Sequence, residues 1–116
     1  MQLRLSCPKL WLATQAVDFR KSIDGLCEII VSEFAMDLKE SLFIFHSRDL
    51  KKLKILAWHN NGFVLTYKRL IRGRFKVGRS EAELLTLDEK QLSWLIAGLD
   101  WVSMSEFKEL EFEDYF

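Results

Sequence analysis

The chain has 116 residues, of which 49% are apolar and 29% charged, and its 17 basic side chains balance 17 acidic ones. This composition excludes a disordered chain, and no apolar run approaches the roughly 20 residues of a membrane span. The N-terminus lacks the sustained apolar core of a secretory signal, so we expect one cytoplasmic domain over residues 1–116. Cys7 and Cys27 have no C-x-x-C spacing and are expected to be free thiols.

The first predicted elements are a short strand and a helix. Residues 10–14, LWLAT, predict either an edge strand or the strand through which the chain enters the sheet. Apolar residues then recur at helical spacing from Phe19 to Phe34, which predicts a helix over residues 18–35. Asp18 is the predicted N-cap because a carboxylate accepts hydrogen bonds from first-turn backbone amides.

Alternating apolar residues in the middle of the chain predict an antiparallel β-meander. Residues 42–45 and 53–58 read as strands joined by a turn over residues 47–49. Asn61-Gly62 predicts a type I′ hairpin turn into a third strand over residues 63–68, and a short strand is expected over residues 75–77.

Helical signals dominate the last third of the chain. Thr86 and Glu89 match a capping box, and the helix that they open is expected to end near Gly98. Ser103 and Glu106 repeat this pattern and predict a third helix through about residue 110. The fold class is therefore predicted to be α+β, with an antiparallel meander of three to five strands packed against two or three helices.

Charge is unevenly distributed along the chain. Residues 1–79 hold 15 basic and 7 acidic side chains, whereas residues 80–116 hold 2 basic and 10 acidic ones. The excess is concentrated in residues 41–79, with Asp49 as the one acid among ten cations: Arg48, Lys51, Lys52, Lys54, Lys68, Arg69, Arg72, Arg74, Lys76 and Arg79. A basic segment of this kind predicts a surface that binds an anionic partner. The alternative is that the basic and acidic parts of the chain neutralise each other in the fold.

The basic segment supplies the candidate functional residues. Cations neutralise phosphates and release counterions, and exposed aromatic rings among them can stack on bases. The candidate DNA-binding residues, two of them near the expected helix start, are Arg20, Lys21, Arg48, Lys52, Lys54, Lys68, Arg69, Arg72 and Arg74. The sequence has no glycine-rich phosphate loop and no histidine pair at metal-binding spacing, so no catalytic residue, metal or cofactor is expected.

Four blocks of sequence resemble a known family. These are LWLAT with VDFRKSIDGL, then LFIFHSR with LKIL, then WHNNGFVLTYKRLIRGRF, and finally LTLDEKQLSWLIAGLDW. Together they resemble the small TnpB-type accessory protein that the second reading frame of the insertion-sequence-sixty-six family of bacterial elements encodes. The resemblance covers about residues 10–101, and residues 102–116 form an acidic extension beyond it.

The resemblance implies a role in DNA transposition beside a separate transposase that performs the strand-transfer chemistry. Our leading hypothesis is a non-enzymatic factor that binds the DNA ends of the insertion sequence. The alternative is an adaptor that docks on the transposase or self-associates as a homo-oligomer, without binding DNA. A metal-dependent nuclease built from scattered acids is a third and weaker hypothesis.

Overall fold

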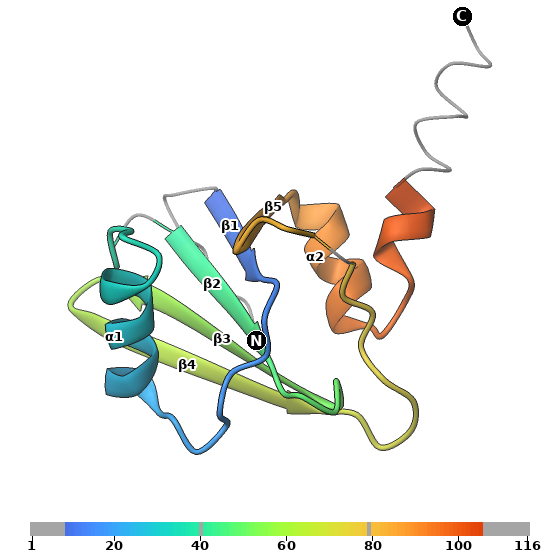
Figure 1. Ribbon diagram of the computed structural model, residues 1–116, viewed down its shortest axis with the longest axis horizontal. Coiled ribbons are helices and arrows are strands. Elements are labelled where there is room, and N and C mark those ends of the chain that lie inside the picture. The colour runs from blue at the N-terminus through green and yellow to red at the C-terminus, as the bar shows by residue number, and fades with distance from the viewer. Residues whose placement is uncertain (1–8, 40, 79, 106–116) are drawn as a thin grey trace, which may run out of the picture.

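The computed structural model describes residues 9–39, 41–78 and 80–105 (Figure 1). Its elements, in chain order, are β1 (Lys9–Ala13), α1 (Ile23–Ser32), β2 (Ser41–His46), β3 (Lys52–His59), β4 (Gly62–Arg69), β5 (Leu84–Leu87) and α2 (Glu89–Ile96), and residues 101–105 form one more helical segment. The predicted α+β class is therefore confirmed. Cys7, Arg79, the end of the predicted third helix and the acidic tail lie outside the described residues.

The five strands form one mixed sheet in the order β4-β3-β2-β1-β5. Strands β2, β3 and β4 make the predicted antiparallel meander. Strand β1 pairs in parallel with β2 and antiparallel with β5, so it lies inside the sheet. Of the two predicted alternatives the edge strand is wrong, and β1 is the strand through which the described chain enters the sheet. Helix α1 provides the crossover that a parallel pair requires, because a tight turn cannot join two parallel strands.

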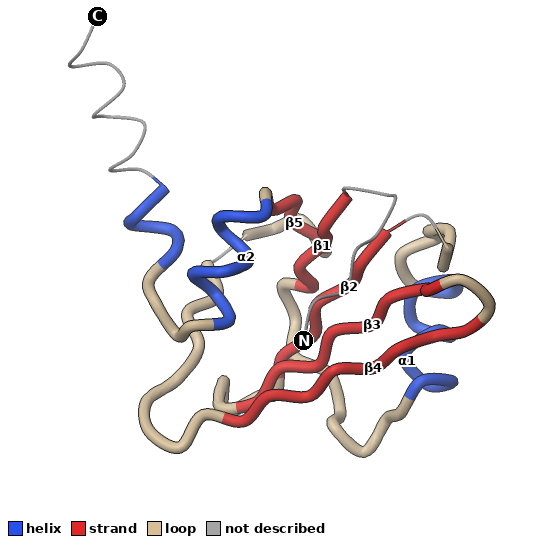
Figure 2. Tube along the Cα trace, turned by 180° about the vertical axis from the view of Figure 1, so that it is seen from behind, coloured by secondary structure: helices blue, strands red, loops and turns tan. Residues whose placement is uncertain are grey.

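Both faces of the sheet are covered, and each has its own core. On one face, Phe43, Phe45 and Leu56 pack with Leu26 and Ile30 of α1. On the other face, the core holds Leu12, Leu42, Ile44, Leu53, Ile55 and Ala57 from the sheet, with Phe75, Leu95 and Trp101 from the segments that follow β4. Every residue of β2 is buried, as expected for a strand in a three-layer arrangement. Helices α1 and α2 pack on opposite faces of the sheet (Figure 2).

Helix α1 begins at Ile23, so the predicted start at Asp18 is wrong. The Asp18 carboxylate instead accepts a hydrogen bond from the Arg20 backbone N–H at 2.9 Å and from the Arg20 guanidinium, which forms a turn before the helix. Ser22 occupies the N-cap position without a side-chain hydrogen bond. A local aspartate turn has competed successfully with helix initiation at this site.

The predicted capping box is also displaced. Thr86 lies in β5, and the box is formed by Asp88 and Gln91: Asp88 Oδ1 accepts from the Gln91 N–H at 2.7 Å, and Gln91 Oε1 accepts from the Asp88 N–H at 2.9 Å. Gly98, with φ of +79°, follows the helix end as predicted. The next helical segment is capped by Asp100 rather than by Ser103, since Asp100 Oδ1 accepts from the Ser103 N–H.

Two turn predictions need small corrections. The hairpin between β3 and β4 is present, but His59 pairs with Gly62, so the turn is centred on Asn60 and Asn61. Asn60 alone among the residues of this turn has a positive φ, 55°, and the predicted type I′ turn at Asn61-Gly62 is wrong. The predicted strand over residues 75–77 is wrong: these residues form a loop, from which the Phe75 side chain is buried in the core. None of the helices in the described ranges combines the length and apolar character that crossing a bilayer needs.

Candidate nucleic-acid interface

Three loops meet where β2 ends and β3 begins. The Leu70 N–H, after β4, donates to the Lys51 carbonyl oxygen at 2.8 Å, and the Phe75 N–H donates to the Leu50 carbonyl oxygen at 2.6 Å. The segment between β1 and α1 is joined to the same end of the sheet, since the Val17 N–H donates to the His46 carbonyl oxygen at 3.1 Å. Sequence segments that are far apart therefore share one end of the molecule.

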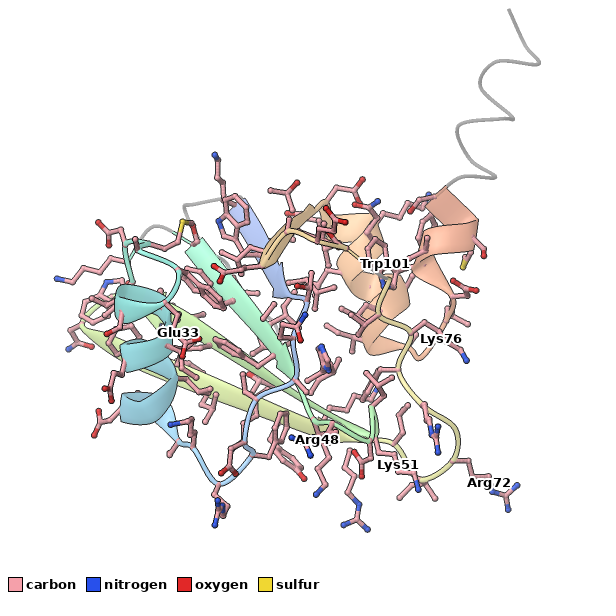
Figure 3. The ribbon with its side chains drawn as sticks, in the orientation of Figure 1. Glu33, Arg48, Lys51, Arg72, Lys76 and Trp101 are labelled. Carbon is pink, nitrogen blue, oxygen red and sulfur yellow. The ribbon has the colours of Figure 1, made fainter. Side chains whose placement is uncertain are left out.

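This end, which we call the basic end, gathers most of the candidate cations. It consists of Arg20, Lys21, Arg48, Lys51, Lys52, Arg69, Arg72 and Arg74, all exposed except the half-buried Lys52. Lys52 and Arg69 are register partners across β3 and β4. Arg48, Lys51 and Arg72 lie along the same side of the molecule, and Glu33, the C-cap of α1, lies far from them (Figure 3).

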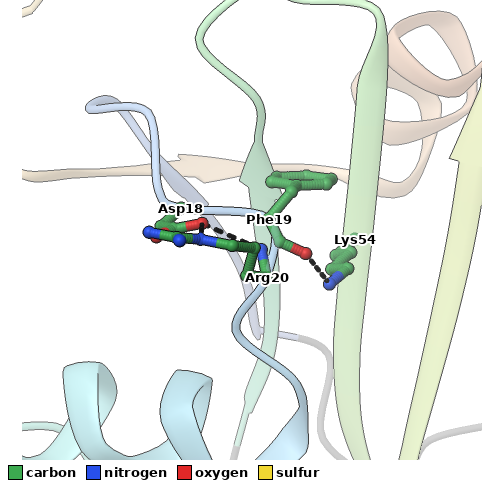
Figure 4. Close-up of polar contacts among 4 residues, drawn as sticks. All are labelled: Asp18, Phe19, Arg20 and Lys54. Carbon is green, nitrogen blue, oxygen red and sulfur yellow. Dashed lines mark hydrogen bonds and ion pairs between the residues drawn. The ribbon is translucent and has the colours of Figure 1, made fainter.

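Two carboxylates lie among these cations, and both are engaged locally. Asp18 Oδ2 is 2.6 Å from Nη2 of Arg20, the one ion pair among the described residues (Figure 4). This hydrogen-bonded pairing lowers the pKa of Asp18 to about 2. Asp49 accepts from Ser47 Oγ at 2.6 Å and from the Lys51 N–H at 3.1 Å, and the Ser47 hydrogen bond is the main reason why its pKa is lowered. Both groups stay ionised at neutral pH.

The two carboxylates, Asp18 and Asp49, are too few to neutralise the eight cations of the basic end. Within the described ranges, no acidic side chain pairs with Arg48, Lys51, Lys52, Arg69, Arg72 or Arg74. An open hollow of about 560 Å³ is lined by residues 16–20, residues 47–49 and Lys52, so Arg20 approaches it from the segment before α1, and Arg48 and Lys52 approach it from the β2–β3 hairpin. Such a concentration of unpaired cations attracts polyanions, because each phosphate that a cation neutralises releases condensed counterions into the solvent.

Comparison with known proteins identifies the family. The family model described as IS66 Orf2 like protein matches residues 8–106. The chain belongs to the IS66 Orf2-like family. It is 31% identical over 94 residues to the uncharacterized protein y4jC of Sinorhizobium fredii, a match covering 80% of each chain. It is 32% identical over 94 residues to the uncharacterized protein y4hO of the same organism, covering 80% of this chain and 82% of the other. No solved structure matches.

Membership of the IS66 Orf2-like family confirms the resemblance seen in the sequence and assigns the chain an accessory role in transposition. The matched region exceeds the expected span of residues 10–101 by a few residues at each end. Its blocks build the sheet: LWLAT contains most of β1, LFIFHSR most of β2, and LKIL the middle of β3. The long block WHNNGFVLTYKRLIRGRF spans the hairpin, β4 and the loop that carries Arg72 and Arg74.

Lys54 is a candidate that the fold places elsewhere. Lys54 is only 8% exposed, and its Nζ donates to the carbonyl oxygens of Phe19 at 2.8 Å and Lys21 at 2.7 Å. Nζ also lies 5.0 Å from the centroid of the Phe19 ring. Burial lowers the pKa of Lys54, an effect that Asp18 opposes and Lys52 reinforces. Lys54 therefore fastens the loop before α1 to the sheet and is not free to contact a ligand.

Replacing Lys54 with methionine should lower the free energy of unfolding by about 1.5–3 kcal/mol, because two backbone carbonyl groups lose a charged donor. Urea denaturation would measure this loss. Lys52→Met is the matched control, because Lys52 is the next residue on the same face of β3 and its ammonium makes no hydrogen bond in the described ranges. It should change stability by less than about 0.5 kcal/mol. Equal losses in the two variants would contradict the anchoring role of Lys54.

Lys68 is also engaged within the protein. Its side chain lies on the α2 face of the sheet, where Nζ donates to the Ile96 carbonyl oxygen at 2.7 Å. The contact places a cation at the C-terminal end of α2, where the helix dipole is negative. Of the nine candidates, the basic end thus collects seven: Arg20, Lys21, Arg48, Lys52, Arg69, Arg72 and Arg74.

Most aromatic rings of residues 41–79 pack inside the protein and are not free to stack on bases. Phe43, Phe45 and Phe75 are fully buried, and the Trp58 and Phe63 rings pack edge to face with centroids 5.0 Å apart. Tyr67 is 50% exposed and packs against Phe19, on the face that adjoins the basic end.

Two residues at the basic end were missed as site candidates. Lys51 is part of the β2–β3 turn, and its place in the charged run Arg48-Asp-Leu-Lys-Lys52 was the available signal. Ile71 is 89% exposed, and no pattern in the sequence distinguishes it from the apolar residues of this segment that are buried.

Proposed function

We propose that this member of the IS66 Orf2-like family is a non-catalytic DNA-binding accessory factor of transposition, and that the basic end is its DNA-binding surface. The observation that carries the proposal is the convergence of cations from three separate loops, with both neighbouring carboxylates occupied by local hydrogen bonds. A surface built in this way is suited to the phosphate backbone and would depend little on base sequence.

The seven predicted cations at the basic end, joined by Lys51, are the proposed phosphate contacts. Arg72 and Arg74 lie beyond the end of β4, and Arg48 and Lys51 in the turn after β2. Their guanidinium and ammonium groups suit phosphate oxygens, which accept charge-assisted hydrogen bonds. Lys54 and Lys68 are left out of the proposed surface because their ammonium groups are held by backbone carbonyls.

A transposase is the proposed protein partner, and it would supply the strand-transfer chemistry. The accessory chain would then act by holding DNA, which requires no catalytic side chain of its own. This division of labour also explains why a surface of phosphate contacts is sufficient, since recognition of specific bases can be left to the larger partner.

Fluorescence anisotropy with a duplex of the element's terminal sequence tests the proposal. If six or more phosphates are contacted, affinity should fall by roughly 10³-fold or more between 50 and 200 mM salt. Absence of binding at low salt would refute DNA binding. If the protein then still retained the transposase in size-exclusion chromatography, the adaptor hypothesis would replace it. Incubation with Mg²⁺ or Mn²⁺ should leave the duplex intact, and nicking would contradict the non-catalytic role.

A further inference from the structure

Ile71 is an apolar side chain on the most highly charged loop of the protein. It is 89% exposed, more than the other exposed large apolar residues of the described ranges, Val31, Tyr67 and Leu99. An isolated exposed isoleucine is unremarkable on a polar surface, but this one lies between Arg69 and Arg72. No acidic residue occurs between Asp49 and Glu81, so the whole segment around Ile71 is basic.

The loop that carries Ile71 is held at both of its ends. Leu70, half-buried against the core, donates its N–H to the Lys51 carbonyl oxygen at 2.8 Å. Phe75, fully buried, donates its N–H to the Leu50 carbonyl oxygen at 2.6 Å. Only residues 71–74 lie between these anchors, and Gly73, with φ of +78°, forms the turn. The result is a short projecting tip on a fixed base.

Arginine lies on both sides of the projecting tip in sequence. Arg69 precedes Ile71, Arg72 and Arg74 follow it, and all three are exposed. In Figure 3, Arg72 points outward from the loop, away from the body of the protein. Many proteins that bind the minor groove insert an isoleucine, leucine, phenylalanine, methionine or proline between neighbouring base pairs and so kink the duplex, and they carry basic side chains beside this wedge. An apolar protein pocket would instead have to bury the arginines beside Ile71 at a large desolvation cost.

We propose that Ile71 is a wedge that inserts between base pairs of the bound duplex and bends it, with Arg72 and Arg74 holding the adjacent phosphates. This inference rests on the proposed DNA binding and goes beyond it, because phosphate contacts do not require a side chain to enter the base stack. It assigns the protein a mechanical role, which is to deform the DNA that it holds. Insertion should favour flexible pyrimidine–purine steps, where unstacking costs least.

The test uses a duplex of about 30 bp with a central TA step, labelled at both ends for resonance energy transfer. A second copy of the duplex carries 2-aminopurine at this step, whose fluorescence rises when the base is unstacked. Wild-type protein should shorten the end-to-end distance and raise the 2-aminopurine signal. Ile71→Ala should lose both effects while keeping the salt dependence of binding, and Ile71→Leu should restore them.

Val31→Ala is the matched control, because Val31 is an exposed apolar residue on α1. It should bend and unstack the duplex as the wild-type protein does. Circular dichroism should show that every variant is folded.

The possible results separate the wedge from the DNA-binding function. Binding without bending, with Ile71→Ala equal to wild type, would overturn the wedge and leave the proposed function standing. No binding at any salt concentration would remove the basis of both. If Ile71→Ala bends the duplex normally but loses the transposase in co-purification, Ile71 is a protein-docking contact, and the wedge is refuted.

Discussion

Simultaneous replacement of Arg48, Arg72 and Arg74 with glutamine should lower the affinity for duplex DNA by roughly 10²–10³-fold at 0.1 M salt. Each lost phosphate contact should also reduce the slope of log K against log salt by about 0.9. The three side chains are exposed and make no ion pair within the described ranges, so their removal should leave stability almost unchanged. Anisotropy titrations at several salt concentrations would give both the affinity and the slope.

The chain offers a control with the same change in net charge. The exposed cations near the opposite end of the sheet are Lys9, Lys39 and Lys90. Lys9 pairs with Ser41 at the start of β2, and Lys39 lies just before β2. Lys90 lies just after Leu87, the last residue of β5, which pairs with Leu10. Their replacement with glutamine should weaken binding only slightly, through long-range attraction. If both triple variants lose the same affinity, binding depends on net charge alone and the basic end is not the interface.

Phe75→Ala should be strongly destabilising, by about 3–5 kcal/mol, because it empties a fully buried site between the sheet and α2. It should also release the loop above it, since burial of this ring holds the second anchor of residues 71–74 in place. Urea denaturation followed by tryptophan fluorescence would measure the loss.

Ile71→Ala provides the comparison within the same loop. Ile71 and Phe75 are four residues apart, but one side chain is almost fully exposed and the other is not exposed at all. We expect Ile71→Ala to change stability by less than about 0.5 kcal/mol. Similar losses in the two variants would show that the loop does not have a buried anchor and an exposed tip.

The meander could be predicted because its signal is local. Strands β2, β3 and β4 follow one another with short turns, and alternation of apolar side chains reports each of them. The parallel pairing of β1 with β2 could not be predicted in this way, because it depends on a crossover through α1 and on β5, which lies more than 70 residues after β1. Leu84–Leu87 also lacks any feature that separates a strand from the approach to a helix.

Errors at the helix ends have a related physical cause. Thr86 and Asp88 are both good caps, each with a glutamate or glutamine three residues later, and the pairing of Thr86 with Trp11 in the sheet decides between them. Asp18 carries a strong cap signal, but a neighbouring arginine engages its carboxylate. Local sequence shows which groups can cap a helix, and strand pairing or a competing hydrogen bond decides which of them does so.

The sequence predicts which charged residues belong to the site, but it predicts only some of their positions in the fold. Alternation places Lys52 and Lys54 on the same face of β3, and one is half-buried while the other lies beneath the loop before α1. Sequence spacing cannot distinguish them, because this face is covered at Lys54 and more open at Lys52. The same limit applies to Lys68 and Arg69, which are neighbours on opposite faces of β4.

The position of β5 affects how deletion experiments on this protein should be interpreted. All proposed DNA contacts precede Phe75, yet β1 gains its second partner only at Leu84–Leu87, and Leu95 and Trp101 complete the core on the α2 side. A chain that stops after Phe75 would possess the whole binding surface and still expose the apolar face of its sheet. Truncation after Phe75 should therefore abolish DNA binding without removing one contact, and nascent chains should acquire the activity only after residues 84–101 have been synthesised.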